Sequence, residues 1–138
     1  PRMPAAALLD HYLQVDDLGT AERYAHILEE RIDYPLDGGI RLVNPLLEYY
    51  VRTGDYLEAL EWVNCFGQRM VRSPFLRQRA RFFRSFTRLL SGLKAEGWTH
   101  LEARDLRFSV PVILSDRGYP IHALQGWAAV QLGAHLQQ

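Results

Sequence analysis

Arginine side chains recur along residues 75–96 at intervals that favour one face of a helix. The row consists of Arg77, Arg81, Arg84 and Arg88. Its members are four, three and four positions apart, so a helix over this segment would bring their guanidinium groups into line. No acidic residue occurs between Glu61 and Glu96 to offset them. Guanidinium groups bind carboxylates and phosphates through paired hydrogen bonds, so the row predicts contact with an acidic ligand.

Charge is distributed unevenly along the chain, although the net charge is zero. Residues 1–61 contain 12 acidic residues and 5 arginines, a net charge of −7, whereas residues 62–138 contain 4 acidic and 11 basic residues, a net charge of +7. The acidic half of the same chain, that half of a second copy, or an external ligand could therefore neutralise the row. A solvated face paired with local carboxylates is the simplest interpretation, and an acidic protein is the favoured external partner.

Nucleic acid and anionic lipid are weaker candidates for binding to the same arginines. The basic row is one helix long, and the sequence pI is about 7.5 rather than above ~9. No polar pattern recurs at corresponding positions, as RNA-reading helical repeats require. No apolar run approaches the roughly 20 residues that a membrane-spanning helix needs. We therefore expect neither nucleic acid as the main partner nor a membrane span.

Catalytic and metal-binding patterns are missing from the sequence. The histidines are His11, His26, His100, His122 and His135. They do not have the spacing of a zinc site. The single cysteine, Cys65, excludes a disulfide within the chain and is expected to be buried and unreactive. Because glycine-rich phosphate loops and nucleophile motifs are also missing, we expect no enzyme activity, no cofactor and no metal.

The start of the chain and its composition bear on its origin. The chain begins Pro1-Arg2-Met3 without a signal-peptide pattern, which favours the cytoplasm and leaves the periplasm open. We expect one domain over residues 1–138, cut from a longer protein. Arginine outnumbers lysine 15 to 1, a bias that suggests a bacterium with a GC-rich genome.

A segment near the start of the chain returns 38 positions later. Residues 8–24 read LLDHYLQVDDLGTAERY, and residues 46–62 read LLEYYVRTGDYLEALEW. Five positions are identical, and others, such as Asp10 and Glu48, are conservative pairs. Weaker copies occupy residues 89–103 and 110–126. Self-similarity at a period of about 20–50 residues is typical of a solenoid.

The stretch GDYLEAL forms the corner of this unit in its second copy. Gly54 can adopt the left-handed backbone that ends a helix, and Asp16 replaces it in the first copy. The aspartate that follows, Asp17 or Asp55, can cap the next helix. A small residue such as Ala59 lets the two helix backbones approach closely. The unit therefore reads as an antiparallel pair of helices.

These residues resemble the tetratricopeptide repeat family. Its pattern has a leucine and an aromatic residue in the first helix, a Gly-x-Tyr turn, and Ala-Leu in the second helix. The matching positions are Leu46, Tyr50, Gly54, Tyr56, Ala59 and Leu60, with Leu8, Tyr12 and Ala21 in the first copy and Leu114, Gly118, Ala123, Leu124 and Trp127 in the last. The resemblance implies an all-α fold of antiparallel hairpins stacked as a short α-solenoid, which binds proteins on a concave face.

Helices are expected over residues 4–14, 18–32, 40–52, 55–71, 75–96, 99–105, 108–117 and 120–136, with a loop at residues 33–39. Ser73-Pro74 and Thr99 are expected to begin two of them. The stretch RFSVPVIL at residues 107–114 has the β-branched content of a strand, but the repeat favours a short helix. The apolar face of the arginine-rich helix is expected to be Phe75, Phe82, Phe86, Leu89 and Leu93.

The expected partner-binding residues combine the arginine row with two residues of the second repeat. Tyr49 adjoins Tyr50, so the two cannot face the same side of a helix. One of them is expected to face the binding groove or the neighbouring helix pair of the stack, because aromatic residues and arginines often anchor interfaces. The full set is Arg77, Arg81, Arg84, Arg88, Tyr49 and Arg52. The expected function is a scaffold that binds an acidic protein or peptide. The alternatives are a nucleic-acid-binding helical repeat and a self-associating module whose oppositely charged halves meet head to tail.

Overall fold

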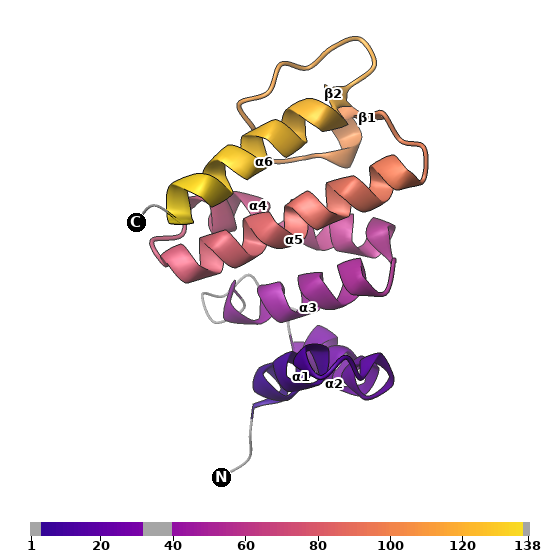
Figure 1. Ribbon diagram of the computed structural model, residues 1–138, viewed down its shortest axis with the longest axis vertical. Coiled ribbons are helices and arrows are strands. Elements are labelled where there is room, and N and C mark those ends of the chain that lie inside the picture. The colour runs from indigo at the N-terminus through magenta and orange to yellow at the C-terminus, as the bar shows by residue number, and fades with distance from the viewer. Residues whose placement is uncertain (1–3, 32–39, 137–138) are drawn as a thin grey trace.

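Helices carry most of the regular structure. The computed structural model describes residues 4–31 and 40–136 (Figure 1), so the loop expected at residues 33–39 lies outside the described residues. The helices are α1 (Ala5–Gln14), α2 (Leu18–Arg31), α3 (Ile40–Arg52), α4 (Tyr56–Arg72), α5 (Leu76–Ala95) and α6 (Ile121–Leu136). The short elements are β1 (His100–Leu101), the 3₁₀ turn η2 (Ala103–Asp105) and β2 (Tyr119–Pro120), which pairs antiparallel with β1. The all-α class predicted from the sequence is confirmed.

The first four helices form two pairs joined by tight corners. Helix α1 packs on α2, and α3 packs on α4. Gly54 has a φ of 78° and Asp16 a φ of 59°, so both adopt the left-handed conformation predicted for them. The carboxylate of Asp17 caps α2 by accepting from the backbone N–H of Thr20 at 3.1 Å, whereas Asp55 makes no side-chain bond of this kind. Because the corners are short, each pair is an antiparallel hairpin.

Helix α3 lies at the centre of the packing. It contacts α1 and α2 below it and α4 and α5 on its other sides (Figure 1). Its Leu46 and Leu47 are fully buried, as is Ala59 of α4. Its Tyr50 stacks on Trp62 of α4 with ring centroids 6.5 Å apart. Burial of these apolar side chains supplies the main stabilising free energy.

Helix α5 turns its apolar face to the core. Phe82, Phe86, Leu89 and Leu93 are fully buried, as the sequence predicts, and so are Phe83 and Leu90 of the same helix. The prediction for Phe75 is wrong, because α5 begins at Leu76 and Phe75 is the exposed residue before it. Ser73 ends α4 as its C-cap, so Ser73-Pro74 does not begin the next helix.

The segment between α5 and α6 differs most from the sequence prediction. The helices expected at residues 99–105 and 108–117 are both wrong. The first range contains β1 and η2, and the second is irregular chain that ends in an isolated bridge between Ser115 and Gly118. Pro111 would remove a hydrogen bond from a helix, and its β-branched neighbours favour extended backbone. Thr99, expected to cap a helix, precedes β1 instead.

Two amide side chains of α4 hold the middle of this segment. Nδ2 of Asn64 donates to the carbonyl of Asp105 at 2.7 Å, and Oδ1 of Asn64 accepts from the backbone N–H of Arg107 at 2.7 Å. One helical turn later, Oε1 of Gln68 accepts from the backbone N–H of Ser109 at 3.2 Å. These bonds satisfy backbone groups that have no sheet or helix partner.

Phe108 anchors the same segment in the core. Its side chain is buried, and its ring meets that of Phe86 of α5 edge to face, with centroids 6.3 Å apart. A Cβ atom on Gly67 of α4 would lie 2.9 Å from the Phe108 ring, so the glycine leaves room for it. The segment is therefore packed against both α4 and α5.

Candidate functional site

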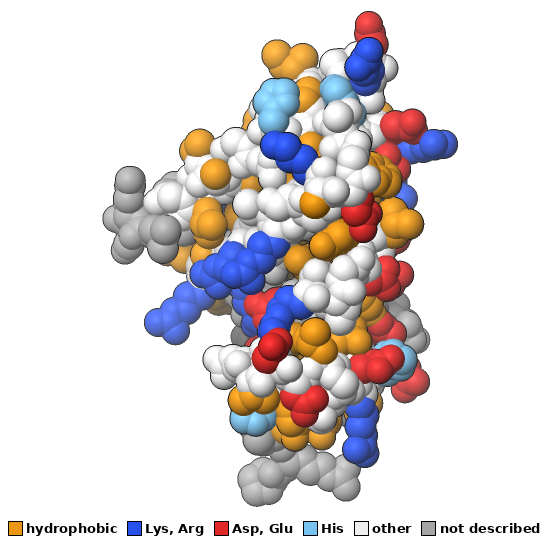
Figure 2. Space-filling view, turned by 45° about the vertical axis from the view of Figure 1, so that its right-hand side comes forward, with side chains coloured by type: hydrophobic (Ala, Val, Ile, Leu, Met, Phe, Trp, Pro, Cys, Tyr) orange, Lys and Arg blue, Asp and Glu red, His pale blue; other side chains and the backbone are white. Residues whose placement is uncertain are grey.

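Three of the four arginines in the predicted row lie on the open face of α5. Arg77, Arg84 and Arg88 are exposed, and they form no ion pair with any residue of the described ranges. Figure 2 shows the largest group of basic side chains at mid-height, the level of α5 in Figure 1. Eleven positions along a helix span about 16 Å. We call these three residues the arginine ridge.

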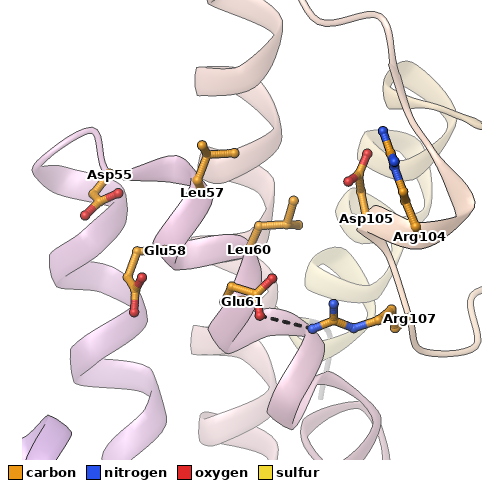
Figure 3. A pocket seen from close by; sticks show the side chains of 8 residues that line it. All are labelled: Asp55, Leu57, Glu58, Leu60, Glu61, Arg104, Asp105 and Arg107. Atoms are coloured by element: carbon orange, nitrogen blue, oxygen red, sulfur yellow. Dashed lines mark hydrogen bonds and ion pairs between the residues drawn. The ribbon is translucent and has the colours of Figure 1, made fainter.

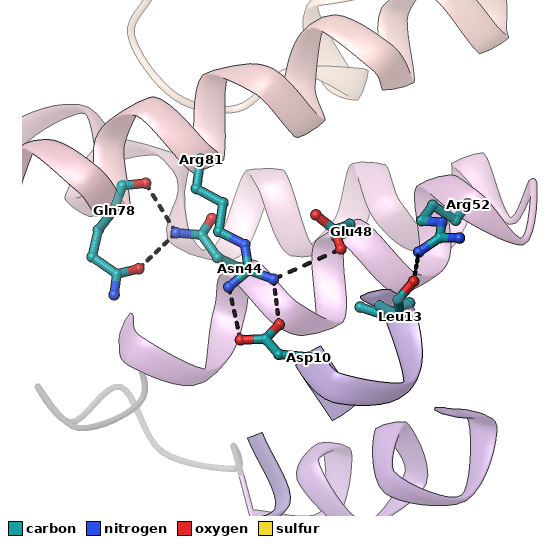
Figure 4. A network of polar contacts seen from close by, with 7 residues as sticks. All are labelled: Asp10, Leu13, Asn44, Glu48, Arg52, Gln78 and Arg81. Carbon is teal, nitrogen blue, oxygen red and sulfur yellow. Dashed lines mark hydrogen bonds and ion pairs between the residues drawn. The ribbon is translucent and has the colours of Figure 1, made fainter. Parts of the chain in front are cut away.

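Arg81, the fourth member of the predicted row, turns toward α1 and α3 (Figure 4). Its guanidinium group makes a two-point contact with the Asp10 carboxylate of α1, with Nη1 3.1 Å from Oδ2. Nη2 also lies 3.8 Å from Oε2 of Glu48 on α3. The side chain of Arg81 is only 26% exposed. Carboxylates of the acidic half thus neutralise this arginine, and the contact joins three helices.

Arg52 also bonds within the protein (Figure 4). Its guanidinium group donates to the carbonyl of Leu13 near the end of α1 and to the carboxylate of Asp16 at the following corner. The Leu13 carbonyl also accepts from the backbone N–H of Asp16 at 3.2 Å, so Arg52 supplies a second donor to it. The contact fixes the first hairpin against α3.

Tyr49 lies in the core rather than at a groove. Its side chain is 8% exposed, and its ring meets that of Tyr50 edge to face with centroids 5.4 Å apart. Burial raises the pKa of the Tyr49 phenol, and the carboxylates of Glu22 and Glu29 add to this effect. Since Tyr50 is buried too, neither tyrosine faces an open groove. Tyr49 lies near Glu22 and Glu29 of α2, which agrees with the other expectation, that one of the two faces the neighbouring helix pair.

A buried amide contact sets how α5 is rotated against α3. Asn44 of α3 is fully buried, and its Nδ2 donates to the backbone carbonyl and to Oε1 of Gln78 at 2.9 and 2.8 Å. Gln78 and Arg81 are both directed to α3 and α1. Arg84 follows Arg81 by three positions, which places it about 60° from Arg81 around the helix, and it is exposed. The network in Figure 4 therefore positions the arginine ridge.

The guanidinium groups of the arginine ridge are suited to binding anions. Each guanidinium group offers five N–H donors in a planar fork and stays protonated, so it can bind a carboxylate or phosphate through two bonds. It cannot act as a general base. Like charges at helical spacing repel one another, and an anionic ligand would relieve that repulsion.

A second surface is an open pocket of about 550 Å³ between the start of α4 and residues 104–107 (Figure 3). Its lining includes Asp55, Glu58, Glu61, Leu57, Leu60 and Arg107. Arg107 pairs with Glu61 at 3.1 Å. Burial, together with the nearby Glu58 and Asp55, raises the pKa of Glu29 on α2. Acidic groups of α2 and α4 thus lie close together, but those of the pocket do not converge on one point in Figure 3, and we assign them no reaction.

The remaining expectations concern metals, the cysteine and membranes. Within residues 4–31 and 40–136, no three His, Cys, Asp or Glu side chains are placed to share a metal ion. Cys65 is exposed, so its expected burial is wrong. It follows the buried Val63 by two positions, which places it on another face of α4. None of the described helices combines the length and the apolar character needed to cross a bilayer.

The sequence contains a signal for the two carboxylates that Arg81 meets, although it does not indicate which arginine of the row meets them. Asp10 and Glu48 occupy matching positions of the similar segments 8–24 and 46–62. Two neighbouring carboxylates need a shared cation, which Arg81 provides. No comparable signal identifies Asn64 as the residue that holds residues 105–107.

Comparisons with protein-family models, with curated proteins and with solved structures find no significant match. The function is therefore argued from the residues of the site alone.

Proposed function

We propose that the protein is a tetratricopeptide-like scaffold that binds an acidic segment of a protein partner on the arginine ridge. The observation that carries this proposal is the division of the predicted row into one neutralised and three exposed arginines. Arg81 is paired with two carboxylates, whereas Arg77, Arg84 and Arg88 are exposed without an ion pair to the described residues.

The packing of the helices supports the repeat part of the proposal. The pairs α1–α2, α3–α4 and α5–α6 follow one another, and α3 contacts both α1 and α5. Asn44 and Gln78, which bond to each other from α3 and α5, are 34 residues apart. The similar segments of the sequence recur after 38 positions, compared with about 34 in the tetratricopeptide family. In such a stack the first helices of successive pairs share one face, and the arginine ridge lies on the first helix of the third pair.

The arrangement of the ridge supports a protein segment as ligand. Three guanidinium groups spread over about 16 Å suit carboxylates that are distributed along a chain. The sequence pI of about 7.5 and a basic row confined to one helix argue against a nucleic-acid surface. Each exposed pair is expected to contribute about 0.2–1 kcal/mol, so binding should be weak and sensitive to salt.

A charge-reversal experiment tests the proposal. The probe is a short fluorescein-labelled peptide of Glu, Asp and Ala, and binding is followed by fluorescence anisotropy at low salt. We expect the wild type to bind and the triple variant Arg77→Glu, Arg84→Glu, Arg88→Glu to lose at least about tenfold in affinity. The matched control is Arg23→Glu, Arg104→Glu, Arg117→Glu, which makes the same charge change at exposed positions outside α5 and should bind normally.

Two results would contradict the proposal. One is equal loss of affinity in the two triple variants, which would mean that only net charge matters. The other is tighter binding of a labelled single-stranded DNA of similar charge with a steep dependence on salt, which would favour the nucleic-acid alternative.

A further inference from the structure

An apolar groove of about 560 Å³ runs between α6 and residues 111–113. Its walls include Pro111, Ile113, Ala123, Gly126, Trp127 and Val130, and no charged side chain of the described residues lines it. Ile113 is 88% exposed and Val130 is 66% exposed. Large apolar side chains gathered in one exposed place mark a surface that another molecule covers.

The composition of α6 limits what can cover this groove. Ile121–Leu136 contains no Asp, Glu, Lys or Arg, whereas α1, α2, α3, α4 and α5 each contain at least one. A charged helix laid in the groove would lose hydration, and no side chain of the lining could pair with it. Among the described helices, α6 of a second copy is the one whose chemistry matches the groove.

The shape of the surface also favours a second copy. A Cβ atom added to Gly126, which lines the groove, would meet nothing within 4 Å, so this glycine leaves a hollow in the groove. The exposed Ile113 projects beside that hollow. A two-fold axis places one patch against the same patch of its partner, so the projecting side chain of each copy can enter the hollow of the other.

We propose that the protein forms a two-fold dimer in which the α6 grooves face each other. The two α6 helices run antiparallel, which sets their dipoles in opposition. A helix of this length extends about 24 Å, so the interface belongs to the small class that buries less than about 1,200 Å² in total. We therefore expect a dimer in micromolar exchange with its monomer. The arginine ridge is not part of this interface.

Substitution of a groove glycine separates dimerisation from folding. Gly126→Gln adds a side chain where the monomer has open space and improves helix propensity, so the monomer should melt at a higher temperature. The same side chain fills the hollow, so the dimer should weaken by at least about tenfold. The control, Gly19→Gln on α2, also has room for its Cβ and should leave dimerisation unchanged. Sedimentation velocity over a concentration series measures both variants.

A second pair of variants tests the apolar character of the surface. Val130→Glu introduces a charge into the groove and should yield a monomer at every concentration, because the buried carboxylate would have no partner. Leu57→Glu is the matched control, since Leu57 is 64% exposed on α4, outside the groove. A wild type that sediments as a monomer throughout the series would overturn the proposal, as would a Val130→Glu variant that dimerises normally.

Salt distinguishes this dimer from head-to-tail association of the oppositely charged halves. Contact between two uncharged helices should persist or strengthen at high salt, whereas contact between charged faces should weaken. Association that disappears at high salt and survives in Val130→Glu would overturn the α6 dimer without affecting the proposal for the arginine ridge.

Discussion

The two N-terminal hairpins and the α5–α6 pair are built in different ways. In α1–α2 and α3–α4, three residues link the helices, and one left-handed residue, Asp16 or Gly54, makes each corner. In α5–α6, residues 96–120 separate the helices, and the linking segment is held by contacts with α4. Asn64 lies 41 positions from Asp105, to which it donates. The first region depends on local backbone preferences, and the second depends on side chains far away in the sequence.

This difference explains where the candidate binding surfaces occur. The short corners allow α1, α3 and α5 to contact one another and to share the Arg81 network, which positions the arginine ridge. The linking segment, residues 96–120, instead adds surface beside α6. It contributes Ile113 to the lining of the groove and Arg107 to the lining of the pocket.

Removing the aromatic anchor of the long segment should have the largest effect. We expect Phe108→Ala to lower the free energy of unfolding by about 3–5 kcal/mol, because it leaves a cavity between α4 and α5. The matched control is Phe75→Ala. Because the Phe75 ring is exposed, this substitution should change the free energy of unfolding by less than about 0.5 kcal/mol. Urea unfolding measures both. Similar small losses in the two variants would show that residues 96–120 are not part of the cooperative fold.

A comparison of two left-handed glycines should have the next largest effect. A Cβ atom on Gly118 would lie 2.2 Å from the carbonyl oxygen of Leu101, whereas one on Gly54 would meet nothing within 4 Å. We expect Gly118→Ala to cost about 3 kcal/mol and Gly54→Ala about 1 kcal/mol. Thermal unfolding should rank them in this order. The reverse ranking would mean that the link between β1 and β2 contributes little to stability.

Loss of the α4 amide should have a moderate effect that is confined to one segment. Asn64→Ala removes bonds to Asp105 and Arg107, and we expect a loss of about 2 kcal/mol. Amide hydrogen exchange should accelerate at Arg107 and Ser109 and stay unchanged at the Gly54 corner. Exchange that accelerates equally at both places would contradict the separation of the two regions.

The smallest expected effect concerns the first corner. Hydrogen bonds from the Thr20 hydroxyl and backbone N–H lower the pKa of Asp17 below its ordinary 3.8. A lowered pKa in the folded state means that the stabilisation is present above pH 3.8 and is lost as the pH falls through the folded-state pKa. Asp17→Ala should therefore lower the melting temperature at neutral pH, and the difference from wild type should shrink in acid. A difference that grows in acid would contradict this account of the cap.

The structure is more predictable from the sequence in the two N-terminal hairpins than in the segment between α5 and α6. The corners at Asp16 and Gly54 are predictable because their backbone preference is carried by the residue itself. The path of residues 99–117 is not, because Phe108 and its Gly67 contact are brought together only by the fold. The arginine row is evident from spacing, but the separate role of Arg81 depends on carboxylates contributed by α1 and α3.

The proposal that the arginine ridge binds an acidic ligand is tested most directly by observing each arginine side chain separately. In a titration of the protein with the acidic peptide, NMR signals of the arginine Nε–Hε groups report which guanidinium groups meet the ligand. We expect the signals of Arg77, Arg84 and Arg88 to shift. The signals of Arg52 and Arg81 should stay unchanged, because these side chains already form hydrogen bonds within the protein. Shifts confined to Arg52 and Arg81, or to arginines outside α5, would contradict the proposal.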